Sequence, residues 1–453
     1  MLTDLTWLEG EFPPRSERPR LERYQQHAAL FETDHTREWE SLFAGLARLY
    51  RKSDPRVMTA LNYHQLLSKK TADFVCGEPP DVSCPNDPDR LSRLLGENDW
   101  FQRLYEGIID VTRYGNAVFK VRGKRLTQVP PLYWYPIVDP KDLKFIQQHV
   151  IAYGVAPDAS GDPTQLFVEI HTPGRVEQRT YALVRGQIGK LVSKPLVEST
   201  GLEDFAVQVL TNLTHSGSLY GMDDYRIING LVAEIMWRLH CAGTVLNKHS
   251  EPSMSGPSSA LTWDDRFKTY YLDLGNYFKR EQDTDPEPKY ITWDGNLEAA
   301  WKEIELLTEQ LYILTEMGQA FMEGGTSGGA SSGTALKLRL VSPRIKAARL
   351  TSINEAAVKR IISLLAAANN YNPGPLSIIW QDGLPNDEQE ELQSLILATG
   401  GKPVMSQTRA LRSQGLTDPE VEEELENLRR EEASRTSLNL GIFDSLGGSG
   451  VSE

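Results

Sequence analysis

The stretch GMDDYRIINGLVAEIMWRLH, residues 221–240, decides how the rest of this chain is organised. Its apolar residues recur with the period of one helical face: Ile227, Ile228, Leu231, Val232, Ile235, Met236 and Leu239. This spacing predicts an amphipathic helix from Asp223 to about His249. Asp223 is the predicted N-cap, because its carboxylate can accept hydrogen bonds from the unpaired amides of a first helical turn. Asp223 and Asp224 could also form a metal or acid–base site, but capping explains them more simply.

Two more long helices follow, from about Asn296 to Met322 and from Ala335 to about Asn369. Pro343 lies inside the second of these and predicts a kink, because proline removes a helical hydrogen bond and clashes with the preceding turn. Between the helices runs a glycine-serine segment, residues 323–334, in which neither helix nor strand is stable. Long helices, an insertion at 251–295 and a glycine-rich loop suit a mechanical component better than an active site.

Composition excludes several classes of protein. The net charge of −14 argues against a conventional DNA reader, which would neutralise phosphates with Lys and Arg. Seven basic residues nevertheless gather between 335 and 360, where a solvated helix face paired with acidic neighbours is the simpler explanation. The three cysteines have neither disulfide-framework nor zinc spacing, so we expect no metal and no cofactor. No Walker or H-E-x-x-H motif is present, and the G-x-S-x-G spacing at residues 325–329 lies in the glycine-serine segment and forms no nucleophile elbow between a strand and a helix, so we expect no enzyme.

The remainder of the chain predicts a mixed architecture. Helices are expected at 21–31, 36–51, 58–76 and 89–114, the last interrupted near Gly96. Strands are expected at 116–122, 145–153, 166–171, 175–184, 188–192 and 205–210, then at 269–274, 290–293 and 376–380. Helices are expected again at 387–397, at 406–414 with Ser406 as N-cap, and after Thr417. The fold class is therefore α+β. The apolar runs are too short for a membrane span, and the N-terminus lacks a secretory signal, which predicts a cytosolic protein.

Five short motifs, in order, carry a resemblance that covers nearly the whole chain. They are the Gly77-Glu78-Pro79-Pro80 turn, Tyr114-Gly115-Asn116-Ala117, Tyr135-Pro136 with Asp139-Pro140, Gly221-Met222-Asp223-Asp224, and Ser332-Gly333-Thr334-Ala335 running to Arg339. Together they resemble the portal proteins of tailed double-stranded DNA bacteriophages, of the siphophage type. At Asp223 the family more often has Ser.

The resemblance implies a portal fold with an α/β wing, two long stem helices, a small α/β clip insertion, a kinked long helix and a helical crown. The implied division is a wing at 1–222, stem helices at 223–250 and 297–322 and the clip at 251–296. A tunnel loop at 323–334, a long kinked helix with a wing strand at 335–385, a crown at 386–433 and a disordered tail at 434–453 complete it.

The implied function is a dodecameric ring at the unique capsid vertex, a channel for DNA packaging and ejection, found in the virion and in the host cytoplasm during assembly. The implied partners are the terminase large subunit, major capsid and scaffolding proteins, head-tail adaptors and, non-specifically, double-stranded DNA; no membrane is expected. The tunnel loop would touch DNA through Glu323, Gly324, Gly325, Thr326, Ser327, Gly328, Gly329, Ser331, Ser332 and Gly333. Lys337, Arg339, Arg344 and Lys346 are possible basic channel contacts.

Alternatives stay open at this point. The glycine-serine segment could be a surface linker without a role. The protein could be a soluble head-tail adaptor or scaffold without a DNA channel, or a DNA-processing motor subunit.

Overall fold

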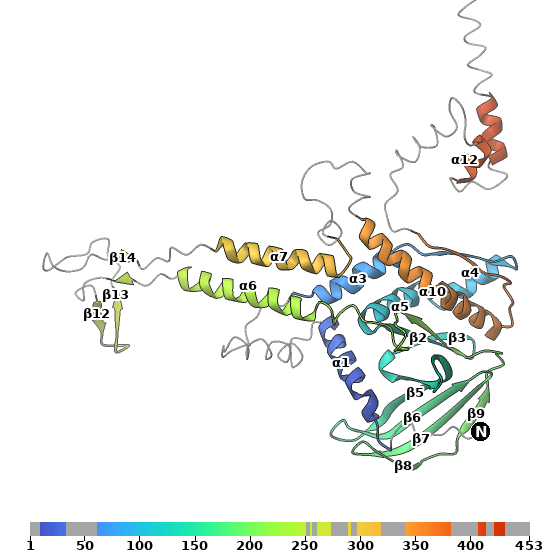
Figure 1. Ribbon diagram of the computed structural model, residues 1–453, viewed down its shortest axis with the longest axis horizontal. Coiled ribbons are helices and arrows are strands. Elements are labelled where there is room, and N and C mark those ends of the chain that lie inside the picture. The colour runs from blue at the N-terminus through green and yellow to red at the C-terminus, as the bar shows by residue number, and fades with distance from the viewer. Residues whose placement is uncertain are drawn as a thin grey trace, which may run out of the picture. The chain divides into compact units, whose positions relative to one another are not determined.

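The computed structural model describes residues 10–32, 61–250, 254–255, 261–272, 289–290, 297–318, 340–381, 406–413 and 421–430. The chain forms two compact units, residues 1–383 and 384–453 (Figure 1). The predicted helix at 36–51, the helix at 387–397, the glycine-serine segment and the tail at 434–453 all lie outside the described residues.

The first unit opens with helices, as predicted. They are η2 (Arg15–Glu17), α1 (Arg18–Glu32), α3 (Tyr63–Cys76), α4 (Pro88–Glu97) and α5 (Trp100–Tyr114). Helix α3 begins at Tyr63 rather than Met58, because the Asn62 side chain accepts a hydrogen bond from the amide of Gln65 at 2.8 Å and caps it. The break between α4 and α5 falls at Asn98 and Asp99, just after the Gly96 expected to interrupt the helix.

Two antiparallel sheets follow the helices. Six strands form the larger one: β4 (Trp134–Asp139), β5 (Asp142–Pro157), β6 (Pro163–Thr172), β7 (Arg175–Val184), β8 (Gln187–Leu191) and, paired with β7, β9 (Leu196–Ser199). The smaller sheet has the order β10 (Val207–Thr211), β2 (Asn116–Arg122), β3 (Arg125–Val129). The structure confirms the predicted strands in this region and adds β3, β4 and β9. A short helix, η3 (Pro131–Tyr133), leads into β4.

Side-chain alternation gives the larger sheet two buried faces. Val150, Ala152 and Val168 point to one face and pack with Leu21 of α1. Trp134 and Ile151 point to the other face and pack with Val118, Val129 and Val207 of the smaller sheet. The larger sheet thus lies between α1 and the smaller sheet, as expected when successive strand residues alternate between faces.

The long helices are α6 (Asn229–Ser250), α7 (Glu298–Leu314) and α10 (Val341–Ala368). Helices α6 and α7 lie side by side and are called the stem hairpin below (Figure 1). The expected kink at Pro343 is not seen, because in the described residues α10 begins at Val341. Pro343 therefore lies in the first turn, where its missing N–H would have had no helical partner.

Short strands complete the first unit. β1 (Asp81–Ser83) pairs with β15 (Ser377–Ile379), which confirms that the chain returns to a strand after the long helix. In the predicted clip, β11 (Met254–Ser255) pairs with β14 (Lys289–Tyr290), and β12 (Leu261–Asp264) with β13 (Thr269–Leu272). The second unit contains α12 (Gln407–Ser413) and a helical segment at 421–430. Ser406 caps α12, since its hydroxyl accepts from the amide of Arg409 at 3.3 Å.

The structure confirms a mixed helical and antiparallel-sheet fold. The domain boundaries at 222, 250, 296, 322, 334, 385 and 433 remain predictions. Within the described ranges, no helix is both long and apolar enough to cross a membrane.

Candidate functional site

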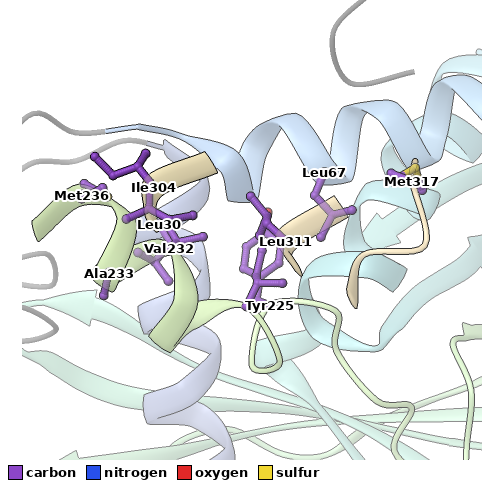
Figure 2. Packing of buried hydrophobic residues seen from close by; sticks show 11 residues of the cluster. Leu30, Leu67, Tyr225, Val232, Ala233, Met236, Ile304, Leu311 and Met317 are labelled. Atoms are coloured by element: carbon purple, nitrogen blue, oxygen red, sulfur yellow. The ribbon is translucent and has the colours of Figure 1, made fainter. Parts of the chain in front are cut away.

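The candidate site is the place where α6 begins, α7 ends and α10 begins, and we call it the junction: residues 221–225 with the groups that contact them. The apolar cluster beside it combines residues of α1, α3, the α6 region and α7. It extends from Met236 and Ile304 through Tyr225 and Leu311 to Met317 (Figure 2). The described chain stops at Gly318 and resumes at Leu340, so both ends of segment 319–339 start from this place.

Two glycines from separate sequence motifs meet at the junction. Gly115, at φ +84°, ends α5, and Gly221 precedes α6. A Cβ atom at Gly115 would lie 2.1 Å from the Gly221 carbonyl oxygen, and one at Gly221 would lie 2.0 Å from the Gly115 carbonyl oxygen. The amide of Gly221 donates to the Asn116 side chain at 3.1 Å. Only glycine allows the two backbones to approach this closely.

Asp223 is confirmed as a capping residue, although the α-helix starts later than predicted. Its Oδ1 accepts from the amide of Arg226 at 2.8 Å, and the turn this closes precedes α6, which begins at Asn229. Its other oxygen lies 3.4 Å from Nε of Arg23, and its Oδ1 lies 3.8 Å from Nε2 of His27, both on α1. Asp223 therefore joins the start of the stem to α1.

Tyr225 lies between two buried histidines. Its ring centroid is 5.2 Å from that of His27 and 4.9 Å from that of His64, and its hydroxyl lies 2.7 Å from the Ser68 hydroxyl. His27 Nδ1 lies 2.8 Å from the Arg113 carbonyl, and His64 Nε2 lies 2.8 Å from the Asn229 side-chain oxygen. Each nitrogen must carry the proton, because its neighbour can only accept.

Burial keeps both imidazoles neutral. Loss of solvent lowers the pKa of His64 to about 4, although the hydrogen bond to Asn229 works in the opposite direction. Burial also lowers the pKa of His27, against the attraction of Asp223. Two neutral histidines, one tilted and one edge-on to the Tyr225 ring, make this a packed structural centre rather than an acid–base site.

Asp224 binds three elements together. Its backbone amide donates to the Thr112 carbonyl of α5 at 2.8 Å, and its Oδ1 accepts from the Asn212 side chain at 2.9 Å. Its Oδ2 lies 2.6 Å from Nζ of Lys346 on α10. The same ammonium donates to the carbonyl of Thr315, just past the end of α7, at 3.1 Å. One buried cation thus links the end of α7, the start of α10 and the first residues of the stem.

A second ion pair lies beside the first. Glu316 has the left-handed backbone angle φ +58°, and its carboxylate pairs with the Arg349 guanidinium on both oxygens. Non-glycine residues in this conformation persist where surrounding contacts hold them. Further along α10, the side chain of Asn354 accepts from the Thr211 amide at 2.7 Å and donates to the Thr211 carbonyl at 2.9 Å. Helix α10 is therefore fixed to β10 as well as to α7.

The predicted channel residues lie in different places. Glu323 to Gly333, Lys337 and Arg339 are outside the described residues. Arg344 is exposed on the first turn of α10. Lys346 is only 4% exposed and is paired with Asp224, so the prediction that it contacts DNA is corrected: desolvated and neutralised inside the subunit, its ammonium is not available to phosphate. Three or more Asp, Glu, His or Cys side chains arranged to hold a metal are not found in the described part of the chain.

Sequence reasoning missed several residues of the junction: Thr315, Glu316, Arg349 as a partner of Glu316, and Asn354. The sequence did contain one signal, which concerns Lys346. This lysine interrupts an otherwise uncharged face of α10, and a charged residue on such a face indicates a buried partner. The partner itself, 122 positions away, could not be read from local pattern.

The stem hairpin leaves apolar side chains exposed. Ile304 and Leu311 of α7 are buried, whereas Leu306 and Ile313 are 52% and 60% exposed. Each pair is seven residues apart, so each occupies one face of the helix, and the two faces are nearly opposite at 100° per residue. Trp301 is also exposed. Leu306 and Ile313 are therefore without cover from the described residues, on an outer face of α7 that also carries the exposed Glu309 and Gln310.

Comparisons with known proteins bear on the stem and the helices after it. Residues 220–437 match the model of a family described as phage portal protein, SPP1 Gp6-like. This range includes Gly221, the stem hairpin, α10 and α12. No curated protein matches the chain.

Two similar solved structures are distant. A chain in the virion of the native gene transfer agent (GTA) particle shares 11% identity at a TM-score of 0.37, covering 83% of this chain and 99% of that one. A chain in the neck of the native GTA particle, computed with C12 symmetry, shares 12% identity at a TM-score of 0.35, covering 78% and 88%. Likeness at this level supports no functional argument, and the family match stands without it. By that match, which begins at the junction, residues 220–437 of this chain are similar to the phage portal proteins.

Proposed function

We propose that this chain is a phage portal protein that assembles into a closed ring at the unique capsid vertex, and that the ring is the channel through which double-stranded DNA is packaged and later ejected. The family match over residues 220–437 supports the portal role. The structural observation that carries the ring is the exposure of two large apolar side chains, Leu306 and Ile313, on the outer face of α7.

Ring closure gives that face a partner. Apolar side chains exposed on one face of a subunit are removed from water when another molecule binds there. In a head-to-tail ring, a patch on one subunit meets a different surface of the next, and every copy is satisfied when the rotation closes. A stem hairpin that contacts its neighbour through Leu306 and Ile313 would bury both side chains in each copy.

Two observations support the channel role. They are the net charge of the chain and the position of the described residues that flank segment 319–339. A protein of net charge −14 would hold DNA weakly, which suits sliding. Residues 323–333 would narrow the channel, with Lys337, Arg339 and Arg344 as basic contacts. The ring would perform no bond chemistry, since its work is to guide DNA while a motor supplies the energy from ATP.

The proposed partners follow from the same role. Residues 251–296 would dock the terminase large subunit during packaging and head-tail adaptors afterwards, and the wing would meet capsid and scaffolding proteins. The protein would then be found in the virion, and in the host cytoplasm during assembly. Double-stranded DNA would be bound without sequence preference, through phosphates.

Native mass spectrometry of the purified full-length chain tests the ring. Twelve copies of the 50.9 kDa chain give about 611 kDa, and negative-stain images should show a central hole. A neighbouring subunit number with a hole would also support the proposal. A monomer or dimer at high concentration and varied salt would contradict it and favour an adaptor without a channel. ATP hydrolysis by the pure protein would favour a motor subunit.

A further inference from the structure

A groove lies between β1 and the corner at which α4 meets α5, and we call it the β1 groove. Its volume is about 590 Å³, which is in the range of ligand-binding pockets. Residues 79–82 form one wall, and residues of α4 and α5, among them Leu95, Trp100 and Phe101, form the other. The first wall includes the two prolines of the Gly77-Glu78-Pro79-Pro80 motif, for which the ring and the channel give no role.

One edge of β1 has no strand beside it. Among the described residues, β1 pairs with β15 alone. β15 contributes no residue to the lining of the groove, so the groove lies beside the other edge of β1. Backbone groups at an open edge are a template for pairing with a further strand. An extended peptide that adds to such an edge gains main-chain hydrogen bonds, and its alternate side chains enter the adjoining groove.

Both walls of the β1 groove are held in place by contacts within the subunit. Pro79 and Pro80 fix the φ angles of the backbone that leads into β1. In the other wall, the Asn98 side chain accepts from the amide of Leu126 in β3 at 2.9 Å, and Arg103 Nε donates to the Asn98 carbonyl at 2.8 Å. A groove with fixed walls loses little conformational entropy on binding, which favours affinity.

The lining of the groove determines which occupant fits. Trp100 is only 5% exposed, and its Nε1 has no hydrogen-bond acceptor among the described residues, so a backbone carbonyl of an occupant would supply the missing acceptor. Leu95 and Phe101 add apolar surface. The charged residues of the lining are Asp81 and Asp99, and the lining contains no Lys or Arg. Such a groove repels phosphate and carboxylate groups and attracts basic side chains.

We propose that the β1 groove binds an extended segment of a partner protein. The segment pairs with the open edge of β1, places apolar side chains against Trp100 and carries Lys or Arg beside Asp81 and Asp99. The proposal goes beyond the ring and the channel and rests on neither, because every residue that carries it belongs to one subunit. A ring that binds no such segment would contradict this inference alone, and a monomer that binds one would contradict the ring alone.

A display library of random linear octapeptides, selected on the immobilised full-length protein, is the probe. We expect enriched peptides to have apolar residues at alternate positions with Lys or Arg beside them. Fluorescence anisotropy then gives the Kd of the most enriched peptide. Its binding should slow hydrogen exchange about tenfold in residues 79–83, because strand pairing bonds the amides of the open edge. Exchange in residues 229–236 should stay unchanged.

Gly96→Met is the decisive variant. Gly96 lines the groove, lies on α4 and has nothing within 4 Å of an added Cβ, so methionine would occupy the groove without disturbing the fold. The Kd should rise about tenfold or more, while the thermal midpoint stays at or above that of the wild type. Gly230→Met is the matched control, because Gly230 also lies on a helix with open space around it but does not line the groove. It should leave the Kd unchanged.

Two further variants test the chemistry of the lining. Trp100→Phe keeps an aromatic ring but removes the N–H, and it should raise the Kd about tenfold. Trp263→Phe, at an exposed tryptophan outside the groove, should not change it. Asp99→Asn keeps a residue that tolerates φ +49°, and it should raise the Kd about threefold and weaken its dependence on salt. Asp89→Asn, an exposed aspartate of α4 outside the lining, is its control.

Three outcomes would overturn the proposal. Selection could enrich no peptide, or the enriched peptide could bind Gly96→Met with the wild-type Kd, which would place its site elsewhere. Binding that left exchange in residues 79–83 unchanged would show that no strand is added to β1. Slow exchange of the same residues in the free protein would also contradict the proposal, because another part of the chain would already pair with the open edge.

Discussion

The junction and the outer face of the stem hairpin differ in how far their side chains are covered by the rest of the subunit. At the junction, the charges of Asp223 and Asp224 are paired within the subunit, and Tyr225 is enclosed by two rings. On the outer face of α7, the described residues give Leu306 and Ile313 no such cover. The comparison teaches that one part of the protein is completed by its own chain, whereas the other would be completed, in the ring that we propose, by a neighbouring subunit.

The difference also separates two kinds of consequence for mutations. A change at the junction alters contacts that exist in a single subunit, so it should appear as a loss of folding free energy. A change on the outer face of α7 alters contacts that form only in the proposed assembly, so the isolated subunit should hardly respond. Four predictions test this division, in order of decreasing effect on subunit stability.

The largest effect is expected where the two glycines meet. Gly115→Ala and Gly221→Ala should each lower the free energy of unfolding by more than about 4 kcal/mol, because the new methyl group would overlap a backbone carbonyl that cannot move away. Gly115→Ala adds the strain of φ +84°. Urea unfolding followed by tryptophan fluorescence measures the loss.

Gly230→Ala is the control for both substitutions. Gly230 lies on α6 with nothing within 4 Å of an added Cβ, so alanine there should stabilise by up to about 1 kcal/mol through its helix propensity. Equal changes in unfolding free energy for Gly230→Ala and Gly221→Ala would show that the backbones of Gly115 and Gly221 are not in close contact.

The second effect compares two lysines of α10. Lys346→Met alone should cost about 3–5 kcal/mol, because it leaves the Asp224 carboxylate buried without its cation. Lys359→Met should cost under about 0.5 kcal/mol, because its pair with Glu355 is solvent-exposed and screened. Thermal and urea unfolding of both variants give the ratio of the two losses of unfolding free energy. Similar losses in the two would mean that Lys346 is not buried in solution.

The third effect is a pH dependence that comes from the histidines beside Tyr225. The pKa of His64 is about 4 in the folded protein and 6.5 when unfolded, so the unfolded chain binds more protons between these values. The contribution is fully present above pH 6.5 and is lost as the pH falls to about 4, on the order of 3 kcal/mol. His27, whose pKa is also lowered, acts in the same direction.

Stability measured from pH 7.5 to 4, in the wild type and in His64→Gln, tests this dependence. Glutamine can still donate to Asn229 but does not titrate, so the curve should become flatter. His215→Gln, at an exposed histidine, should leave it unchanged. If the stability of His64→Gln depended on pH as steeply as that of the wild type, another group would control the acid sensitivity.

The smallest effect on the subunit is expected from Leu306→Gln combined with Ile313→Gln. Both side chains are more than half exposed, so the unfolding free energy of the dissociated subunit should change by less than about 0.5 kcal/mol. Assembly should nevertheless fail, with subunits in place of rings in native mass spectra. Rings of normal mass in this variant would show that another face closes the assembly.

Local chemistry made much of this structure predictable from the sequence. The 3.6-residue period located α6, α7 and α10, alternation located β5, β6 and β7, and polar residues at helix starts predicted the caps at Asp223 and Ser406. These features depend on residues within a few positions of one another. Helix starts were less accurate: Pro343 falls in the first turn of α10 and not in a kink.

The tertiary structure alone decided which residues meet. Gly115 contacts Gly221, Lys346 pairs with Asp224 and Asn354 bonds Thr211 across separations that no periodicity encodes. From the sequence, Lys346 belonged to a basic cluster and was predicted to touch DNA. The partner of a charged side chain can be identified only in the folded chain, because the free energy of burying the charge depends on the oxygens that surround it.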